Sequence, residues 1–122
     1  MAHGTVNWFQ VSTDDPKGAQ AFYGGLFNWT FAADPDSGAT YQVVTTPGAD
    51  RPSGGIADTR GESPNVAEFF VLVSDVAAAA KQAEQLGGKV VISPKTTPDG
   101  LTFAHLQDPS GNHFGIYTEP TR

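Results

Sequence analysis

The first half of the chain changes from a strand-like to a helix-like pattern near residue 15. Residues 5–12 alternate so that Phe9 and Val11 share one face, which predicts a strand. Asp15 and Pro16 favour a helix start there, because aspartate caps a first turn and proline suits the first helical position. The residues Ala19, Phe22, Tyr23, Leu26 and Phe27 then form one apolar stripe at helical spacing. Three short strands are expected around 28–34, 39–45 and 53–58, with a turn at 35–38.

The second half repeats the first at a constant offset of 60 residues. The matched positions are Phe9 and Phe69, Val11 and Val71, Asp15 and Asp75, Ala19 and Ala79, Leu26 and Leu86, and the pairs Gly55-Ile56 and Gly115-Ile116. A strand at 67–73, a helix ending at a left-handed cap on Gly87-Gly88, and strands near 89–93, 101–107 and 112–118 are therefore expected. A fixed period of this length indicates one supersecondary unit used twice.

This pattern predicts an α+β fold made of two strand–helix–three-strand (βαβββ) units with a cleft between them. The units cover about residues 5–60 and 65–120, and a chain of 122 residues is expected to form one domain over 1–122. The segment 108–112, Asp-Pro-Ser-Gly-Asn, fits a type I turn with a glycine bulge between the last two strands. That turn would place His105 opposite Gly115, and Phe103 opposite Tyr117.

Composition narrows the possible partners. Seven Lys plus Arg against thirteen Asp plus Glu give a formal net charge of −6, which argues against binding to nucleic acid or to an anionic membrane surface. Cysteine is absent, which excludes disulfides, thiolate chemistry and cysteine-based zinc sites. No leader-like start and no long apolar run is evident, so a cytoplasmic location is expected.

The chain resembles the vicinal oxygen chelate superfamily, which includes glyoxalase I, extradiol dioxygenases, and bleomycin- and fosfomycin-resistance proteins. The resemblance covers the whole chain and is carried by the element order, by segment 11–23 leading to Leu26-Phe27-Asn28-Trp29, and by the ending Asp108-Pro-Ser-Gly-Asn-His-Phe-Gly115. It implies a curved mixed sheet around a cleft, a small-molecule ligand, and a homodimer. It specifies the fold better than the activity, because this fold hosts unrelated chemistries.

The resemblance also implies where a metal would bind. In metal-dependent members the ligands come from the first and last strands of each unit, and these positions fall on Trp8, Glu68, Gly55 and Gly115. Tryptophan and glycine side chains cannot ligate a divalent cation, so one carboxylate remains of four positions. We therefore expect no metal and no cofactor. The two glycines are expected to leave open room in the cleft.

Strand alternation predicts a cleft lined by rings with sparse polar groups, as small-molecule pockets are. The expected ligand-binding residues are Trp8, Gln10, Glu68, Phe70, Phe103, His105, His113, Gly115 and Tyr117.

The first hypothesis is a metal-free protein that binds a small antibiotic-like or aromatic molecule. The second is a lyase or isomerase that uses Glu68 with His105 or His113 as base and acid. The third is a glyoxalase- or dioxygenase-type metal enzyme with these same three residues as shifted ligands. A purely structural interpretation is also possible for these residues. Trp8 could fill the space that a metal would occupy, and Glu68 could lie at the solvent-exposed rim of the cleft. The two histidines could be hydrogen-bonded surface residues.

Overall fold

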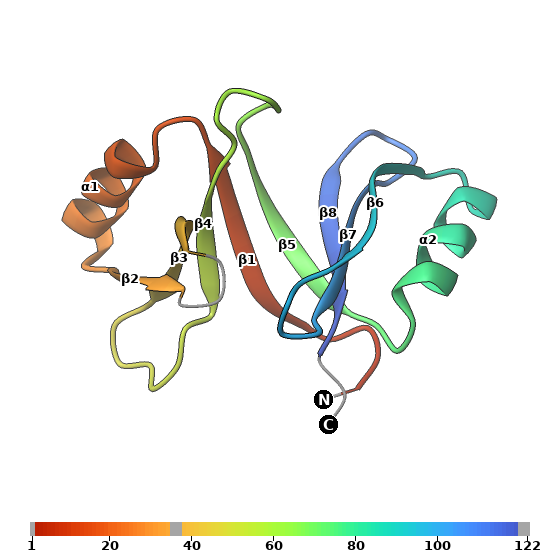
Figure 1. The fold of residues 1–122 in the computed structure, drawn as a ribbon, viewed down its shortest axis with the longest axis horizontal. Helices are drawn as coiled ribbons and strands as arrows, with labels where there is room; N and C mark the ends of the chain where they lie inside the picture. Colours follow the sequence, from red (N-terminus) through yellow and green to blue (C-terminus); the bar gives the residue numbers. More distant parts are fainter. Residues whose placement is uncertain (1, 35–37, 120–122) are drawn as a thin grey trace. The chain divides into compact units, whose positions relative to one another are not determined.

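The structure, a computed structural model, describes residues 2–34 and 38–119, and it confirms the predicted α+β fold. A strand, a helix and three strands follow one another twice (Figure 1). The elements are β1 (Val6–Thr13), α1 (Pro16–Phe27), β2 (Thr30–Asp34), β3 (Gly38–Thr45), β4 (Gly54–Asp58), β5 (Val66–Leu72), α2 (Val76–Gln85), β6 (Lys89–Thr96), β7 (Thr102–Gln107) and β8 (His113–Thr118). The first three residues of the predicted turn at 35–38 lie outside the described residues.

The chain divides into two compact units. The N-terminal unit is Trp8–Glu68, and the C-terminal unit joins Met1–Asn7 to Phe69–Arg122. The strand order is β2-β3-β4-β1 in the first unit and β5-β8-β7-β6 in the second. Pairing within each unit is mixed: β1 with β4, and β5 with β8, pair parallel, and the other neighbours pair antiparallel. The pairing partners also repeat. Val11 lies beside Ile56, and 60 residues later Val71 lies beside Ile116, so the repeat seen in the sequence is a repeat of strand register.

Both helices begin at the predicted caps, and the second ends as predicted; the first ends at a left-handed cap on Asn28, a residue that the sequence analysis assigned to the following strand. The Asp15 carboxylate accepts a hydrogen bond from the Gly18 amide at 3.1 Å, and Asp75 accepts one from Ala78 at 3.0 Å. At the end of α2, Gly87 has a φ of +97°, and the Gly88 amide donates to the Ala83 carbonyl at 2.8 Å. This is the left-handed helix end that glycine favours.

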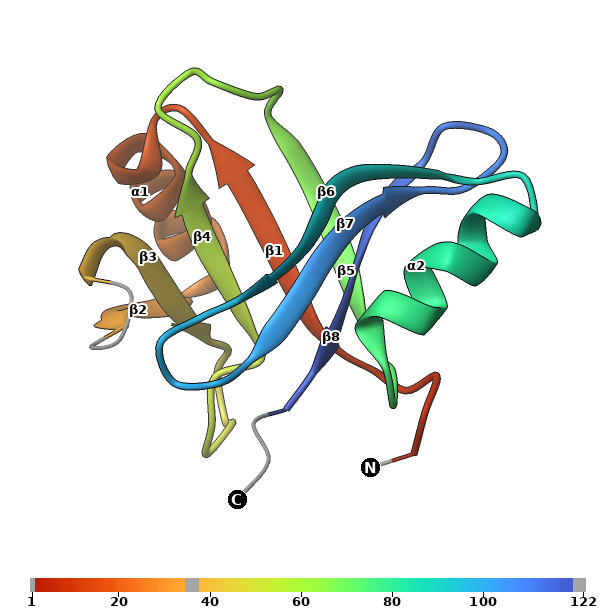
Figure 2. The same cartoon turned by 45° about the vertical axis from the view of Figure 1, so that its right-hand side comes forward.

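The C-terminal unit has a conventional core between α2 and one face of its sheet. Figure 2 shows α2 alongside β6, β7 and β8, against which it packs. Buried in this core are Val73, Val76, Ala80, Ala104, Leu106 and Ile116. Because successive residues of a strand point to opposite faces, the neighbours of these core residues define the sheet face opposite α2.

The N-terminal unit differs, because α1 buries none of its residues. Its apolar stripe has the predicted spacing, yet Phe22 is 62% and Leu26 59% exposed. The inner side of the helix contributes Tyr23, whose ring stacks on Trp29 with the centroids 5.2 Å apart, and Trp29 in turn lies 5.3 Å from Phe9. The stripe is therefore only partly a core surface.

Neither this helix nor α2 has the length and apolar character needed to cross a bilayer, and no other helix occurs in the described ranges.

Candidate functional site

Four rings gather on the C-terminal unit's sheet face opposite α2, and we call them the aromatic face: Phe70, Phe103, His105 and Tyr117. The register between β7 and β8 pairs His105 with Gly115 and Phe103 with Tyr117, which confirms both predicted pairs. On the other side of Gly115, β5 places Phe70 directly beside it. The turn holds this register because the Asp108 carboxylate accepts hydrogen bonds from the Ser110 and Asn112 amides, both at 2.9 Å.

His105 is the centre of the aromatic face. Its imidazole meets Phe70 edge-on at a centroid distance of 5.4 Å and 85°, and Phe103 at 5.7 Å and 86°. His105 and Phe70 are only 9% and 5% exposed, whereas Phe103 and Tyr117 are half-buried. The inner two rings therefore support the outer two, which solvent or a ligand can reach.

The Tyr117 hydroxyl adds an anchored polar group at this face. It donates a hydrogen bond to the Asn7 side-chain carbonyl, and burial raises the pKa of Tyr117 despite that bond. Asn7 was missed by the sequence analysis. Strand alternation sets Asn7 apart from its neighbour Trp8, and no local signal in the sequence pairs residue 7 with residue 117.

His113 lies at the start of β8, one step along the ladder from the aromatic face. It pairs with Gln107 across the strands, and its Nε2 is 2.9 Å from Gln107 Nε2. By alternation it shares the face of Gly115 and Tyr117, as predicted. Its hydrogen-bond partner is a turn-proximal amide, and it makes none of the ring contacts that surround His105.

The N-terminal unit carries a second, smaller cluster on the sheet face opposite α1. The Trp8 indole N–H donates a hydrogen bond to the Tyr41 hydroxyl at 3.1 Å. Next along β1, the Gln10 side-chain amide donates to the Ser12 hydroxyl at 3.0 Å. Burial raises the pKa of Tyr41 to about 12; the Trp8 hydrogen bond opposes this, and the charges of Asp34 and Glu68 add to it.

Glu68 is 6% exposed and closes the N-terminal unit. Its carboxylate is thus buried, and the alternative in which Glu68 lies at a solvent-exposed rim does not apply. Its carboxylate adds a small part to the raised pKa of Tyr41, after burial and the charge of Asp34. The other two residues of the predicted catalytic set, His105 and His113, belong to the C-terminal unit.

Comparison with known proteins identifies the family. The model of the Glyoxalase/Bleomycin resistance protein/Dioxygenase superfamily matches residues 5–116. The chain belongs to this superfamily. The resemblance that the sequence motifs carried is therefore confirmed.

The curated relatives of this chain carry names that point to different functions. The chain is 31% identical over 115 residues to the "Putative glyoxylase CFP32" of Mycobacterium tuberculosis, a match that covers 93% of this chain and 43% of the relative. It is 33% identical over 116 residues to the "Anthracycline biosynthesis protein DauV" of Streptomyces sp., covering 93% of this chain and 41% of the relative. The chain therefore spans about two-fifths of the length of these curated relatives.

Solved structures agree on the fold. Methylmalonyl-CoA epimerase from Mycobacterium tuberculosis superposes with a TM-score of 0.57 at 14% identity, covering 98% of this chain and 89% of that one. A Staphylococcus aureus protein superposes with a TM-score of 0.60 at 19% identity, covering 97% and 98%. At such identities the likeness supports the shared architecture alone.

Neighbouring aromatic rings take up the space beside the two glycines, Gly55 and Gly115, at which the superfamily resemblance places metal ligands. A Cβ atom at Gly115 would lie 2.3 Å from the Phe70 ring, and one at Gly55 would lie 2.2 Å from the Tyr41 ring. The prediction that these glycines leave open room is therefore wrong, because neighbouring aromatic side chains fill it. Aromatic rings commonly cover strand glycines in this way.

Of the four positions at which the resemblance places metal ligands, three offer no metal-ligating side chain, and the fourth, Glu68, offers a single carboxylate. Trp8 already donates its indole N–H to Tyr41, and both glycines lie under rings. Across residues 2–34 and 38–119, no three histidine, cysteine, aspartate or glutamate side chains come together as a metal site requires. Sequence reasoning missed Tyr41, although its place on β3, two residues from the position opposite Gly55, could have been read from strand alternation.

Proposed function

We propose that the protein binds a small planar aromatic molecule on the aromatic face, without a metal. The observation that carries this proposal is the pair of half-buried rings, Phe103 and Tyr117, directly opposite each other and supported by buried Phe70 and His105. Preformed ring surfaces lose little conformational entropy when a flat ligand stacks on them. The Tyr117 hydroxyl, held by Asn7, supplies a polar group at the edge.

The names of two relatives are compatible with this ligand class. They are called anthracycline biosynthesis proteins, and anthracyclines contain planar fused rings. Aromatic pairs add about 0.5–1.5 kcal/mol beyond the burial of their area. A fused-ring ligand that contacts both outer rings would therefore discriminate strongly against a saturated compound of similar size.

The ligand proposal predicts the effect of removing one outer ring. Phe103→Ala should weaken the binding of anthraquinone-2-sulfonate about tenfold, because one stacking surface is lost. Isothermal titration calorimetry measures this, and cyclohexanesulfonate, which has the same charge and no aromatic ring, should not bind.

The matched control is Phe69→Ala. Phe69 is 49% exposed and stacks on Phe114, on the α2 side of the sheet, so its removal should leave the affinity unchanged. Equal weakening by both variants, or equal binding of the saturated sulfonate, would contradict the proposal.

The catalytic hypothesis is supported by one specific feature, the imidazole of His105 within the ring cluster. In this alternative, His105 transfers a proton to or from the bound molecule. Chromatography of a candidate ligand after incubation separates the two functions. A binding protein returns the ligand unchanged, whereas an enzyme converts it and loses turnover in His105→Ala.

We also propose that the protein acts as a homodimer. The superfamily resemblance implied this, and the exposed stripe of α1 supports it, because an apolar helix surface of this kind usually has a partner.

A further inference from the structure

The contact between Asn7 and Tyr117 sets the chemistry of the polar group on the aromatic face. Both residues belong to the C-terminal unit, and both are half-buried. Tyr117 is fixed by its strand, since β8 pairs it with Phe103 on one side and with Leu72 on the other. The position of its hydroxyl is fixed in addition by the hydrogen bond to Asn7.

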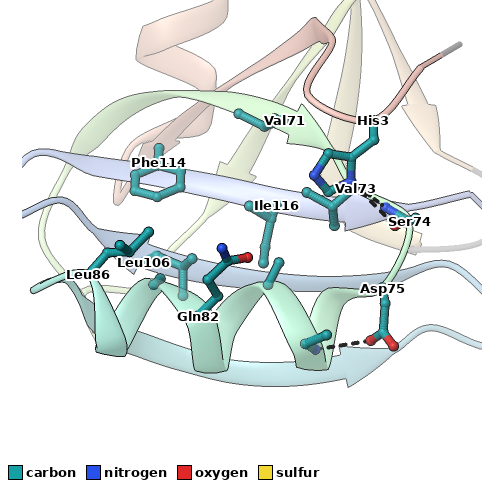
Figure 3. A pocket seen from close by; sticks show the side chains of 13 residues that line it. His3, Val71, Val73, Ser74, Asp75, Gln82, Leu86, Leu106, Phe114 and Ile116 are labelled. Carbon is teal, nitrogen blue, oxygen red and sulfur yellow. Dashed lines mark hydrogen bonds between the residues drawn. The ribbon is translucent and has the colours of Figure 1, made fainter.

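The segment that carries Asn7 is itself tied to the C-terminal unit by hydrogen bonds. The Gly4 amide donates to the Leu72 carbonyl at 2.7 Å. The Ser74 amide donates to His3 Nδ1 at 3.0 Å, beside the pocket that lies along α2 (Figure 3). Asn7 is thus held by the residues just before it in the chain, so its side chain is in place before any ligand arrives.

The proton of the Tyr117 hydroxyl is already committed. A phenol has one proton to donate, and its oxygen can also accept. Tyr117 donates that proton to the side-chain carbonyl oxygen of Asn7, which leaves the lone-pair side of its own oxygen for a ligand. Burial raises the pKa of Tyr117, and the charge of Glu119 adds to this, so the phenol keeps its proton at neutral pH. A negative charge nearby also favours a donor over an acceptor at this edge.

We propose that Asn7 makes the Tyr117 hydroxyl a hydrogen-bond acceptor, so that the aromatic face selects planar molecules with a hydroxyl or amino donor at the ring edge. Asn7 is then a positioning residue, which acts through Tyr117. The inference rests on the proposed aromatic ligand and deepens it by naming the substituent. A ring with only a carbonyl or ether oxygen at this place would set two acceptors against each other, which lowers affinity.

Two naphthalene sulfonates of equal charge test this selection. 6-Hydroxynaphthalene-2-sulfonate offers a donor at the ring edge, whereas 6-methoxynaphthalene-2-sulfonate offers an acceptor alone. Calorimetry should show that the full chain binds the hydroxyl compound about tenfold more tightly, as one hydrogen bond replaces a mismatch. In Tyr117→Phe the ratio of the two affinities should fall to about one, because the selecting oxygen is gone. A merely steric exclusion of the methoxy group would survive that change.

Substitutions of Asn7 test its positioning role. Asn7→Leu removes the oxygen that takes the Tyr117 proton, so the freed hydroxyl can donate to the methoxy compound and the ratio should also fall to about one. Asn7→Asp supplies a carboxylate oxygen in its place and should restore the preference. Because the ratio compares two ligands on the same variant, a partial loss of folded protein affects both alike.

The matched control is Asn65→Leu in the N-terminal unit. Asn65 is exposed, and its side-chain amide donates to the Asp14 carboxylate at 3.2 Å. The same change of residue type there should leave the affinity ratio at about ten. Circular dichroism of each variant checks that the chain is folded.

The results separate this inference from the proposed function. Anthraquinone-2-sulfonate carries no donor, so its binding tests the aromatic face alone. If it binds and Phe103→Ala weakens it, while the unaltered chain binds both naphthalene sulfonates equally, the ligand proposal holds and the donor selection is overturned. A preference that survives in Asn7→Leu overturns the role of Asn7. If none of the three sulfonates binds, both proposals fail.

Discussion

Replacing Gly115 with alanine is expected to lower the free energy of unfolding by about 3 kcal/mol, at the upper end of ordinary overpacking costs. The new Cβ would lie 2.3 Å from the Phe70 ring. That ring is 5% exposed and is in edge contact with His105 at 5.4 Å and with Tyr117 at 6.3 Å, so it has little room to move aside. Urea unfolding measures the change.

Gly25→Ala is the control for this substitution. Gly25 lies in α1 with no atom within 4 Å of its added Cβ, and its φ is not positive. Alanine there should stabilise the protein by about 0.5–1 kcal/mol, because glycine is a poor helix residue. If Gly115→Ala were equally harmless, the ring would be mobile and the packing described for the aromatic face would be wrong. The double variant Phe70→Leu/Gly115→Ala should cost less than the sum of the two single changes.

Raising the pH from 10 to 12 is expected to destabilise the native protein relative to Tyr41→Phe by about 2 kcal/mol. The pKa of Tyr41 is about 12 in the folded chain and 10.0 ordinarily, because burial disfavours the phenolate. The folded state therefore resists ionisation that the unfolded state undergoes. The stability that depends on protonated Tyr41 is fully present below pH 10, and it is lost as the pH rises to the pKa of Tyr41 in the folded chain.

Urea unfolding of both proteins across this pH range provides the measurement. Phenylalanine cannot ionise, so the difference between the two curves isolates Tyr41 from the other titrating groups. Parallel curves would contradict the burial of its hydroxyl. Trp8→Phe offers a second check, because the Trp8 indole N–H lowers the pKa of Tyr41. Its loss should move the tyrosinate absorbance change to higher pH.

Much of the fold could be predicted because local chemistry decided it. Asp15 and Asp75 cap the helices, and Gly87 ends the second one, as their types require. The turn at 108–112 fixed the register of β7 and β8, which in turn fixed the partners of His105 and Phe103. These features depend on residues a few positions apart, which sequence patterns report well.

The unpredicted features depend on distant residues. Alternation shows that Tyr41 and Gly55 share a face, but it does not show that the ring leans over the glycine, because this depends on side-chain rotamers. The bond between Asn7 and Tyr117 joins residues 110 positions apart. Periodicity likewise grouped Phe22 with Leu26 without showing that neither would be buried.

The two covered glycines have a consequence for protein engineering. In the first repeat the covering ring, Tyr41, comes from β3, the antiparallel neighbour of β4, whereas in the second Phe70 comes from β5, the parallel neighbour of β8. The two repeats thus fill the same position from different strands. A carboxylate placed at either glycine would clash with the ring above it, because even a Cβ atom lies within 2.3 Å of that ring. Installing an acidic side chain there would therefore take paired substitutions, the ring being replaced by a smaller side chain first.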